Sequence, residues 1–113
     1  MIVRFWRGRA VVDRAHIYAQ HLFDAVLPKL KALPGFCGVS LLRRVDGHEI
    51  EFVVQTYWES MQAIEEFAGP RPEIAVVEPA ARAALSSFDV TVLHYEVVAG
   101  AVDPVGILHG GEH

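Results

Sequence analysis

The chain has 113 residues, of which 52% are hydrophobic and 21% charged, and its formal net charge is −4. We expect one domain around a single core, because this length is too short for a multidomain enzyme that carries its own nucleotide-binding module. The acidic balance and the lack of a basic cluster argue against nucleic acid and anionic membranes as partners.

The opening run, MIVRFWRGRAVVDR, places arginines among apolar residues and therefore predicts a strand rather than a signal peptide. No stretch of sequence approaches the roughly 20 apolar residues of a membrane span. The single cysteine, Cys37, cannot form an internal disulfide, which fits a reducing compartment. We therefore expect a cytoplasmic protein.

The first two predicted elements are a strand over residues 2–9 and a helix over residues 13–33. The helix is predicted because apolar side chains recur every four residues, at Tyr18, Leu22, Val26 and Leu30. Pro28 lies inside this helix and lacks a backbone N–H, so we expect a bend there.

Two strand-like runs, residues 36–45 and 48–58, flank Asp46-Gly47, a strong signal for a two-residue type I′ turn. That turn would place Val45 opposite His48 and Arg44 opposite Glu49, with Arg44 and Glu49 as a cross-strand ion pair. One face of the hairpin is then mostly apolar and predicts the core, with Cys37, Val39, Leu41, Arg43, Ile50, Phe52, Val54, Thr56 and Trp58.

Ser60 is suited to cap a second helix that buries Ile64 and Phe67 and ends at Gly69-Pro70. Pro72 and Pro79 each suit the first turn of a further short helix. Residues 88–98 predict the last strand, and residues 99–113 form a separate C-terminal tail.

The predicted order is β-α-β-β-α-β, an α+β ferredoxin-like fold with an antiparallel sheet covered by helices on one face. Residues 88–98 are apolar on both sides of the strand, whereas the uncovered face of a monomeric sheet is normally polar. We therefore expect a homodimer in which two sheets face each other.

Four segments carry a resemblance to a known family: IVRFWRGR, LPGFCGVSLLRR, EFVVQTYWESMQAIEEFAG and HYEVV. They resemble the antibiotic biosynthesis monooxygenase family of the dimeric α+β barrel superfamily, over residues 1–98. The resemblance implies a pocket between sheet and helices in each subunit. In the quinone-forming members, a deprotonated aromatic substrate reduces dioxygen there without metal or flavin.

The resemblance also implies site residues. Trp58 stands where those enzymes place a tryptophan at a strand–helix corner, and its indole N–H is a hydrogen-bond donor. Their asparagine four residues earlier is Val54 here, and their tyrosine six residues later is Ile64. The expected apolar lining, with Trp58 as a wall, is Tyr18, Leu22, Phe52, Val54 and Phe67.

Haem-degrading members of the family require an asparagine on the first strand, a tryptophan on the second helix and an axial histidine. This sequence has no asparagine, Phe67 takes the tryptophan's place, and Glu78-Pro79 takes that of the histidine. Haem degradation by that route is therefore not expected.

His21 is the candidate catalytic base, because burial between helix and sheet would favour its neutral, proton-accepting form. A solvated histidine on the helix flank is the alternative. Trp58 is likewise either a packing plug or a site wall, and Arg4 beside Trp6 is either a structural pair or a substrate clamp.

Histidine spacing predicts no metal site, since His16 and His21 are about 140° apart on a helix. His94 and Glu96 point the same way on a strand and form a candidate polar pair.

The functional prediction is a cofactor-independent monooxygenase acting on a small aromatic or polyketide-like molecule. The alternative is a non-catalytic protein of the same fold that binds a small ligand or a partner.

Overall fold

The computed structural model of the chain describes residues 1–100, so the predicted tail lies almost entirely outside the described residues. The elements, in chain order, are β1 (Ile2–Val11), η1 (Val12–Arg14), α1 (Ala15–His21), η2 (Leu22–Val26), α2 (Leu27–Lys31), β2 (Phe36–Asp46), β3 (Glu49–Trp58), α3 (Met61–Ala68), α4 (Pro79–Ala84), β4 (Ser87–Phe88) and β5 (Leu93–Glu96).

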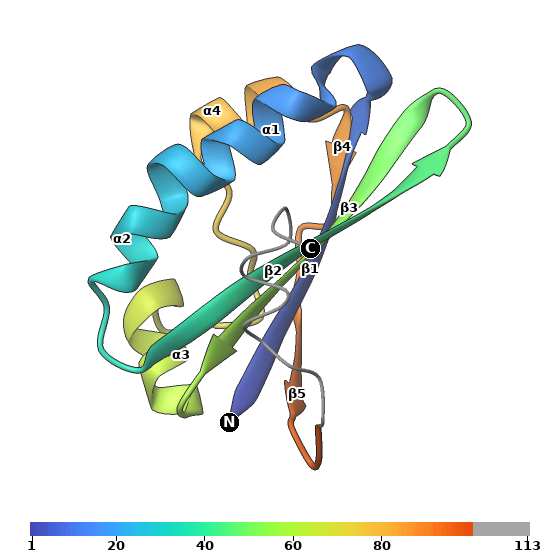
Figure 1. The fold of residues 1–113 in the computed structure, drawn as a ribbon. Coiled ribbons are helices and arrows are strands. Elements are labelled where there is room, and N and C mark those ends of the chain that lie inside the picture. Colours follow the sequence, from blue (N-terminus) through green and yellow to red (C-terminus); the bar gives the residue numbers. More distant parts are fainter. Residues whose placement is uncertain (101–113) are drawn as a thin grey trace, which may run out of the picture.

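The strands form one antiparallel sheet in the order β2-β3-β1-β4, and β5 also pairs with β1. The helices all lie on one side of this sheet (Figure 1). This arrangement confirms the predicted α+β ferredoxin-like fold. The helical face is therefore where an internal cavity can form.

The long first helix is interrupted at its centre. Leu22–Val26 is a π-helical turn, in which the Leu27 N–H bonds to the Leu22 carbonyl, and α2 begins directly after it. Pro28 explains the change, because its ring cannot donate to the carbonyl four residues earlier and clashes with it. The predicted bend is thus a widened turn just before the proline.

The hairpin prediction was wrong in register by two residues. Asp46 pairs with Glu49 and Arg44 with Glu51, so the two turn residues are Gly47 and His48 rather than Asp46 and Gly47. Gly47 has a φ of 64° and His48 has no positive φ, which fits a turn with glycine at its first central position. Arg44 consequently forms its ion pair with Glu51, not Glu49.

The last strand is also shorter than predicted. Residues 88–98 do not form one strand: β4 and β5 are separated by residues 89–92, where Val90 and Val92 bond across to the segment before α4. Pro72 begins no helix, whereas Pro79 is the first residue of α4, as predicted.

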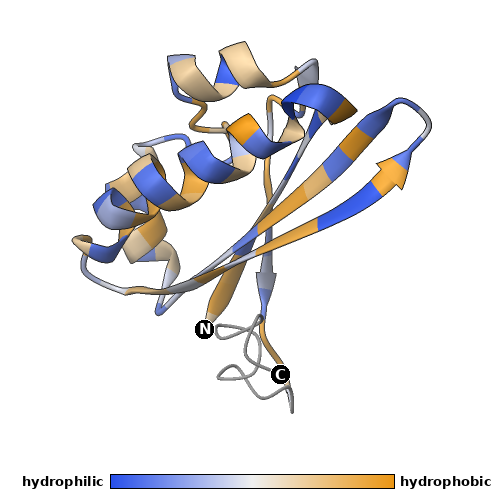
Figure 2. Ribbon diagram, turned by 45° about the horizontal axis from the view of Figure 1, so that its top comes forward, coloured by the Kyte–Doolittle hydropathy of each residue, from blue (hydrophilic) through white to orange (hydrophobic). Residues whose placement is uncertain are grey.

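The core-face prediction holds because a register shift of two pairings leaves each side chain on its original face. Ile50, Phe52, Val54, Thr56 and Trp58 are all buried. Figure 2 shows the corresponding alternation of hydrophobic and hydrophilic residues along β2 and β3. Cys37 and Arg43 are the exceptions, because both are exposed; Cys37 lies at a bulge.

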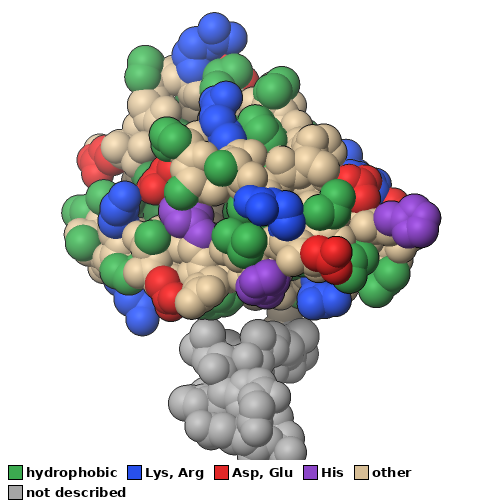
Figure 3. All heavy atoms as spheres, turned by 90° about the horizontal axis from the view of Figure 1, so that it is seen from above, with side chains coloured by type: hydrophobic (Ala, Val, Ile, Leu, Met, Phe, Trp, Pro, Cys, Tyr) green, Lys and Arg blue, Asp and Glu red, His purple; other side chains and the backbone are tan. Residues whose placement is uncertain are grey.

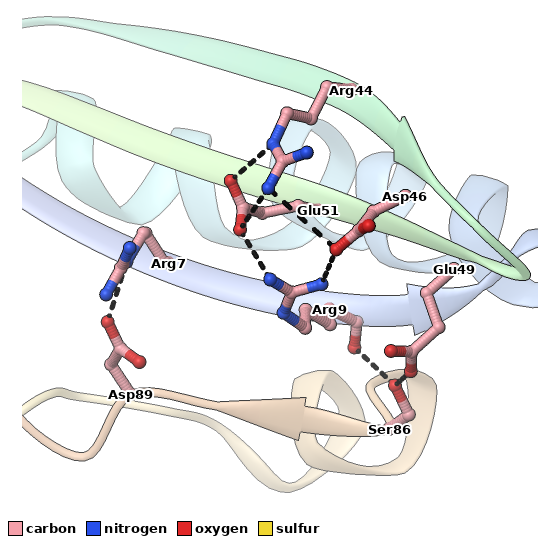
Figure 4. Close-up of polar contacts among 8 residues, drawn as sticks. All are labelled: Arg7, Arg9, Arg44, Asp46, Glu49, Glu51, Ser86 and Asp89. Carbon is pink, nitrogen blue, oxygen red and sulfur yellow. Dashed lines mark hydrogen bonds and ion pairs between the residues drawn. The ribbon is translucent and has the colours of Figure 1, made fainter.

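The uncovered face of the sheet carries an ion-pair network near the hairpin end (Figure 4). Arg9 pairs with Asp46 and with Glu51, and Glu51 also accepts from Arg44. These pairs hold the pKa values of Asp46 and Glu51 below their ordinary values, in each case first through a hydrogen bond from an arginine. The network joins β1, β2 and β3 and explains the polar half of this face.

Candidate functional site

A cavity of about 100 Å³ lies between the inner face of the sheet and the first helix. Its floor comes from β1 and β3, and its cover from α4 and from residues 70–78, here called the covering segment. The cavity is lined by Arg4, Trp6, Tyr18, His21, Leu22, Val26, Leu30, Val54, Thr56, Phe67, Ala75, Val76, Val77, Glu78, Ala81 and Val92. A mostly apolar wall with a few polar groups is typical of small-molecule sites.

Strand register brings the polar floor residues together. Arg4 lies opposite Thr56, and Trp6 lies opposite Val54. Even-numbered residues of both strands share the inner face because side chains alternate along a strand. The polar end of the floor is therefore at Arg4 and Thr56, and the apolar part is at Trp6 and Val54.

His21 enters the cavity from the last turn of α1. Its Nε2 atom is buried and, within the described chain, makes no hydrogen bond. The nearest acidic atom is Glu78 Oε2, at 3.7 Å, and that carboxylate also faces Lys29. Buried polar atoms normally have a partner, so an unpaired ring nitrogen on a cavity wall indicates a place for a ligand.

Arg4 is the second polar group of the cavity, and it is only 5% exposed. It donates to the carbonyls of Pro72 and Ile74, and its Nη1 lies 3.0 Å from His94 Nε2. Burial lowers the pKa of Arg4 to about 10. The guanidinium remains charged near neutral pH.

Thr56 and Trp58 form a coupled pair. The Trp58 indole N–H donates to Thr56 Oγ1 at 2.9 Å, and both residues are buried. Because Thr56 Oγ1 accepts this bond, its own hydroxyl proton is free to be donated into the cavity. Trp58 itself is not among the lining residues.

Tyr18 packs between Phe52 and Trp6, with ring centroids 5.2 and 6.1 Å away. Burial raises the pKa of its hydroxyl well above the ordinary value of 10. The hydroxyl therefore stays protonated and can act as a donor. No hydrogen-bond partner for it is found in residues 1–100.

The structure brings most of the predicted site residues into one place. His21 and four of the predicted lining residues, Tyr18, Leu22, Val54 and Phe67, line the cavity. Phe52 and Trp58 do not line it. Phe52 is covered by Tyr18, and Trp58 packs between Phe36 and Phe67.

Two polar residues were not assigned to the site from the sequence. Thr56 was placed on the core face, and Arg4 was left as either a structural pair with Trp6 or a substrate clamp. The signal that could have found them is their position: both are polar residues at inward-facing positions of central strands. A buried polar side chain at such a position needs a partner.

The other candidate groups from the sequence do not form a second site in the described chain. His94 contacts Arg4 rather than Glu96, and burial, followed by the Arg4 charge, lowers its pKa. The described chain contains no cluster of three or more His, Cys, Asp or Glu residues able to hold a metal ion. Within the same range, no helix is long and apolar enough to cross a membrane.

Charges on the surface seen in Figure 3 are mixed rather than segregated. Basic, acidic and hydrophobic side chains alternate over this face. It presents no basic patch of the kind that nucleic-acid binding requires.

The family model of antibiotic biosynthesis monooxygenases matches residues 1–70. A haem-degrading protein from Mycobacterium tuberculosis is 32% identical, with a TM-score of 0.54 over 91% of this chain and 98% of its own. The related structure of the haem-degrader MhuD from the same organism, with two haems in its active site, is 27% identical, with a TM-score of 0.56 over 90% and 100%.

A monooxygenase from Streptomyces coelicolor, solved with nanaomycin D, is 20% identical, with a TM-score of 0.57 over 91% of both chains. At this identity the likeness extends to the fold alone. No curated protein matches the chain.

Proposed function

The chain belongs to the antibiotic biosynthesis monooxygenase family, and we propose that it oxidises a small aromatic or polyketide-like molecule with dioxygen, without a bound cofactor. One observation carries this proposal: His21 Nε2, a buried imidazole nitrogen without a hydrogen bond in residues 1–100, faces a mostly apolar cavity. Such a cavity excludes water, while the imidazole can take a proton from a bound hydroxyarene.

The reaction balances without an added reductant. A hydroxyarene with an activated CH₂ group loses a proton to the base, and the resulting anion passes one electron to dioxygen. The substrate radical and superoxide combine to a peroxide anion, which takes the proton back from the base and becomes a hydroperoxide. The hydroperoxide then loses water as the O–O bond breaks and a C=O group forms. One O₂ thus converts CH₂ to C=O and releases one H₂O.

The residues of the chain have separate roles in this proposal. His21 accepts the proton, and the Tyr18 and Thr56 hydroxyls donate hydrogen bonds that orient the substrate. Trp58 acts through Thr56 as a positioning residue, because it does not reach the cavity. The aromatic and aliphatic lining holds the ring and excludes water.

Substrate binding requires the covering segment to move. The cavity of about 100 Å³ is smaller than the roughly 300–1,000 Å³ of typical ligand sites. The covering segment has no helix or strand pairing apart from an isolated bridge between Ile74 and Thr91, which makes it the part of the wall best able to yield.

A non-catalytic binding or interaction role is the second candidate function. The small cavity volume favours it, as do Val54 and Ile64, which stand where quinone-forming relatives have an asparagine and a tyrosine. In that case the cavity would hold a ligand or remain packed, and no oxygen would be consumed.

Haem is a further candidate substrate, in view of the haem-degrading relatives. In the described residues, His21 is the only imidazole on the cavity wall, and Glu78-Pro79 stands where an axial histidine is expected. We therefore propose that haem is not the substrate. Addition of hemin should produce no Soret band of a ligated haem.

The test is oxygen uptake by the purified protein with a panel of anthrone-like and hydroquinone substrates, without added metal or flavin. His21→Gln should reduce uptake to near the spontaneous rate, whereas His16→Gln, on the exposed side of the same helix, should not. Trp58→Phe should lower kcat with the dimer intact. Uptake no faster than the spontaneous rate across the panel would favour the non-catalytic role.

We further propose a cytoplasmic homodimer that buries the uncovered face of the sheet. The strand-edge residues Leu93 and Tyr95 are 56% and 54% exposed there, and Tyr95 packs against Phe5 with ring centroids 6.2 Å apart. Exposed apolar groups of this kind mark interaction surfaces. Sedimentation should give twice the chain mass, and Leu93→Lys should shift it toward the monomer.

A further inference from the structure

We propose that Arg4 is the oxyanion-binding residue of the cavity, and that the cavity takes hydroxyarenes as phenolates. This inference rests on the proposed function for the location of the ligand, but it requires no oxygen chemistry. It names the group that the described structure offers to the ionised oxygen of the substrate.

Arg4 is a buried charge without a counter-charge. In the described part of the chain, its hydrogen-bond partners are two backbone carbonyls and one imidazole, and no carboxylate forms an ion pair with it. Every other arginine of β1, by contrast, faces a carboxylate: Arg7 faces Asp89, and Arg9 faces Asp46 and Glu51. A charge removed from water is normally paired, so the missing partner is assigned to an anionic ligand.

The guanidinium has donors left for such a ligand. Of its five N–H groups, two on Nη1 are directed to Pro72 O and His94 Nε2, and one on Nη2 is directed to Ile74 O. The Nε–H and the second Nη2 N–H make no bond within residues 1–100. Nε and Nη2 share one edge of the guanidinium, and paired N–H groups on such an edge can bind two oxygen lone pairs side by side.

The surroundings of Arg4 fit an aromatic anion. Arg4 Cζ lies 5.7 Å from the centre of the Phe67 ring, and Trp6 and Val54 continue the floor away from it. A flat ring placed on this floor would direct its oxygen toward Arg4. The Thr56 hydroxyl, next to Arg4 on the paired strand, offers a further donor to the same oxygen.

The neighbouring titratable groups do not supply the missing negative charge. His94 accepts from Arg4 and is therefore neutral at Nε2, and Glu73 contacts Arg71. Across the cavity are Tyr18, His21 and Glu78, of which Glu78 faces His21 and Lys29. Among the described residues of the cavity wall, a protonated His21 is the other cation able to stabilise a phenolate, so the test must separate it from Arg4.

The test uses 4-nitrophenol, whose phenolate absorbs visible light and whose electron-poor ring is not oxidised by dioxygen. The phenolate absorbance of this probe is recorded as a function of pH, under nitrogen and in the presence of excess protein. An apolar cavity alone would raise the pKa of the bound phenol, whereas a cation lowers it. We expect a fall of about one pKa unit, equivalent to a roughly tenfold preference for the phenolate.

Four variants test which side chain causes the fall in the pKa of the bound nitrophenol. Arg4→Met should abolish it, and Arg4→Lys should retain part of it, because Lys keeps the charge but loses the paired donors. Arg43→Met, which removes an exposed arginine and the same net charge, should leave the shift intact. His21→Gln should also leave it intact. If Arg4→Met does not fold, the sign of the wild-type shift and the Arg4→Lys result decide.

Four results would overturn the inference, and three of them concern nitrophenol alone: a raised pKa for the bound probe, a shift lost in His21→Gln but kept in Arg4→Met, or no binding of the probe. Binding of benzoate together with neutral nitrophenol would mean that Arg4 serves a carboxylate, and would also overturn it. Because the probe is not oxidised, failure of the oxygen-uptake test leaves this result unchanged, so the two proposals fail separately.

Discussion

The corner at Trp58 and the cavity at His21 and Arg4 lie on the same face of one sheet but differ in how their polar groups are satisfied. At the corner, Trp58 is fully buried and its indole N–H is bonded to Thr56. In the cavity, His21 Nε2 has no partner and Arg4 has no counter-charge among the described residues. The corner is arranged for stability, whereas the cavity retains polar groups that reduce stability.

Phe67 connects the two regions. It stacks on Trp58 with ring centroids 5.4 Å apart, and it lies beside Arg4 on the cavity wall. The well-packed corner therefore fixes one wall of the cavity. A change at the corner should act on stability first, and a change in the cavity on function first.

The largest expected effect is that of Trp58→Ala. Loss of a fully buried tryptophan leaves a large void and removes the donor to Thr56, so unfolding free energy should fall by about 3–5 kcal/mol. Denaturant unfolding measures the loss. A decrease below about 1 kcal/mol would mean that the corner does not have the structural role assigned to it.

His21→Leu should show the opposite of Trp58→Ala: little change in stability and a large loss of turnover. Replacing an unsatisfied buried polar group by an apolar one of similar size leaves stability unchanged or slightly raised. Turnover, by contrast, should fall at least about a hundredfold if the imidazole is the base. The two measurements are made on the same preparation, with His16→Leu as the exposed control. A stability loss as large as that of Trp58→Ala would place His21 with the structural core.

The corner has a second sensitive position in Gly35. Its φ is 83°, and an added Cβ would lie 2.6 Å from the Cβ of Ala63 in α3. Gly35→Ala should therefore reduce unfolding free energy by about 1–3 kcal/mol through backbone strain and displacement of α3. Gly47→Ala is the control, because Gly47 also has a positive φ but has no atom within 4 Å of its added Cβ. Equal losses for both would show that the contact with Ala63 contributes nothing.

Sequence patterns predicted the corner better than the cavity. The core-facing side chains of β3, the cap at Ser60 and the helix end at Gly69 follow from alternation and from local hydrogen bonding, and all were found. The hairpin register failed because Asp46-Gly47 and Gly47-His48 are both compatible with a glycine-containing turn. In the observed register, the ionic side chains on the outer face of the sheet form pairs. These pairs join residues of three strands, so a turn motif read along the chain does not reveal them.

The cavity required three-dimensional information. Periodicity placed Tyr18 and Leu22 on the buried side of the helix, and a resemblance placed Trp58 at the corner, but neither shows which side chains reach a shared space. Arg4 and Trp58 were weighed by residue type. Their roles depend on the partner of each N–H: Trp58 donates to Thr56, two residues away, whereas the partners of Arg4 lie as far away in sequence as Pro72 and His94.

The smallest expected effect is a pH dependence of the unfolding free energy that arises from His94, the neighbour of Arg4. Burial, and then the charge of Arg4, lowers the pKa of His94 below its ordinary value of 6.5. The unfolded chain therefore takes up this proton more readily than the folded chain, so the contribution of His94 to stability is complete above about pH 6.5 and is lost as pH falls through the folded-state pKa. Protonation would also remove the Nε2 lone pair that Arg4 needs. His94→Gln keeps a hydrogen-bond acceptor but does not titrate, so its unfolding free energy should decline less than that of the wild type between pH 7 and pH 5. Identical declines would show that His94 does not link Arg4 to pH, and the cavity would then resemble the corner in this respect.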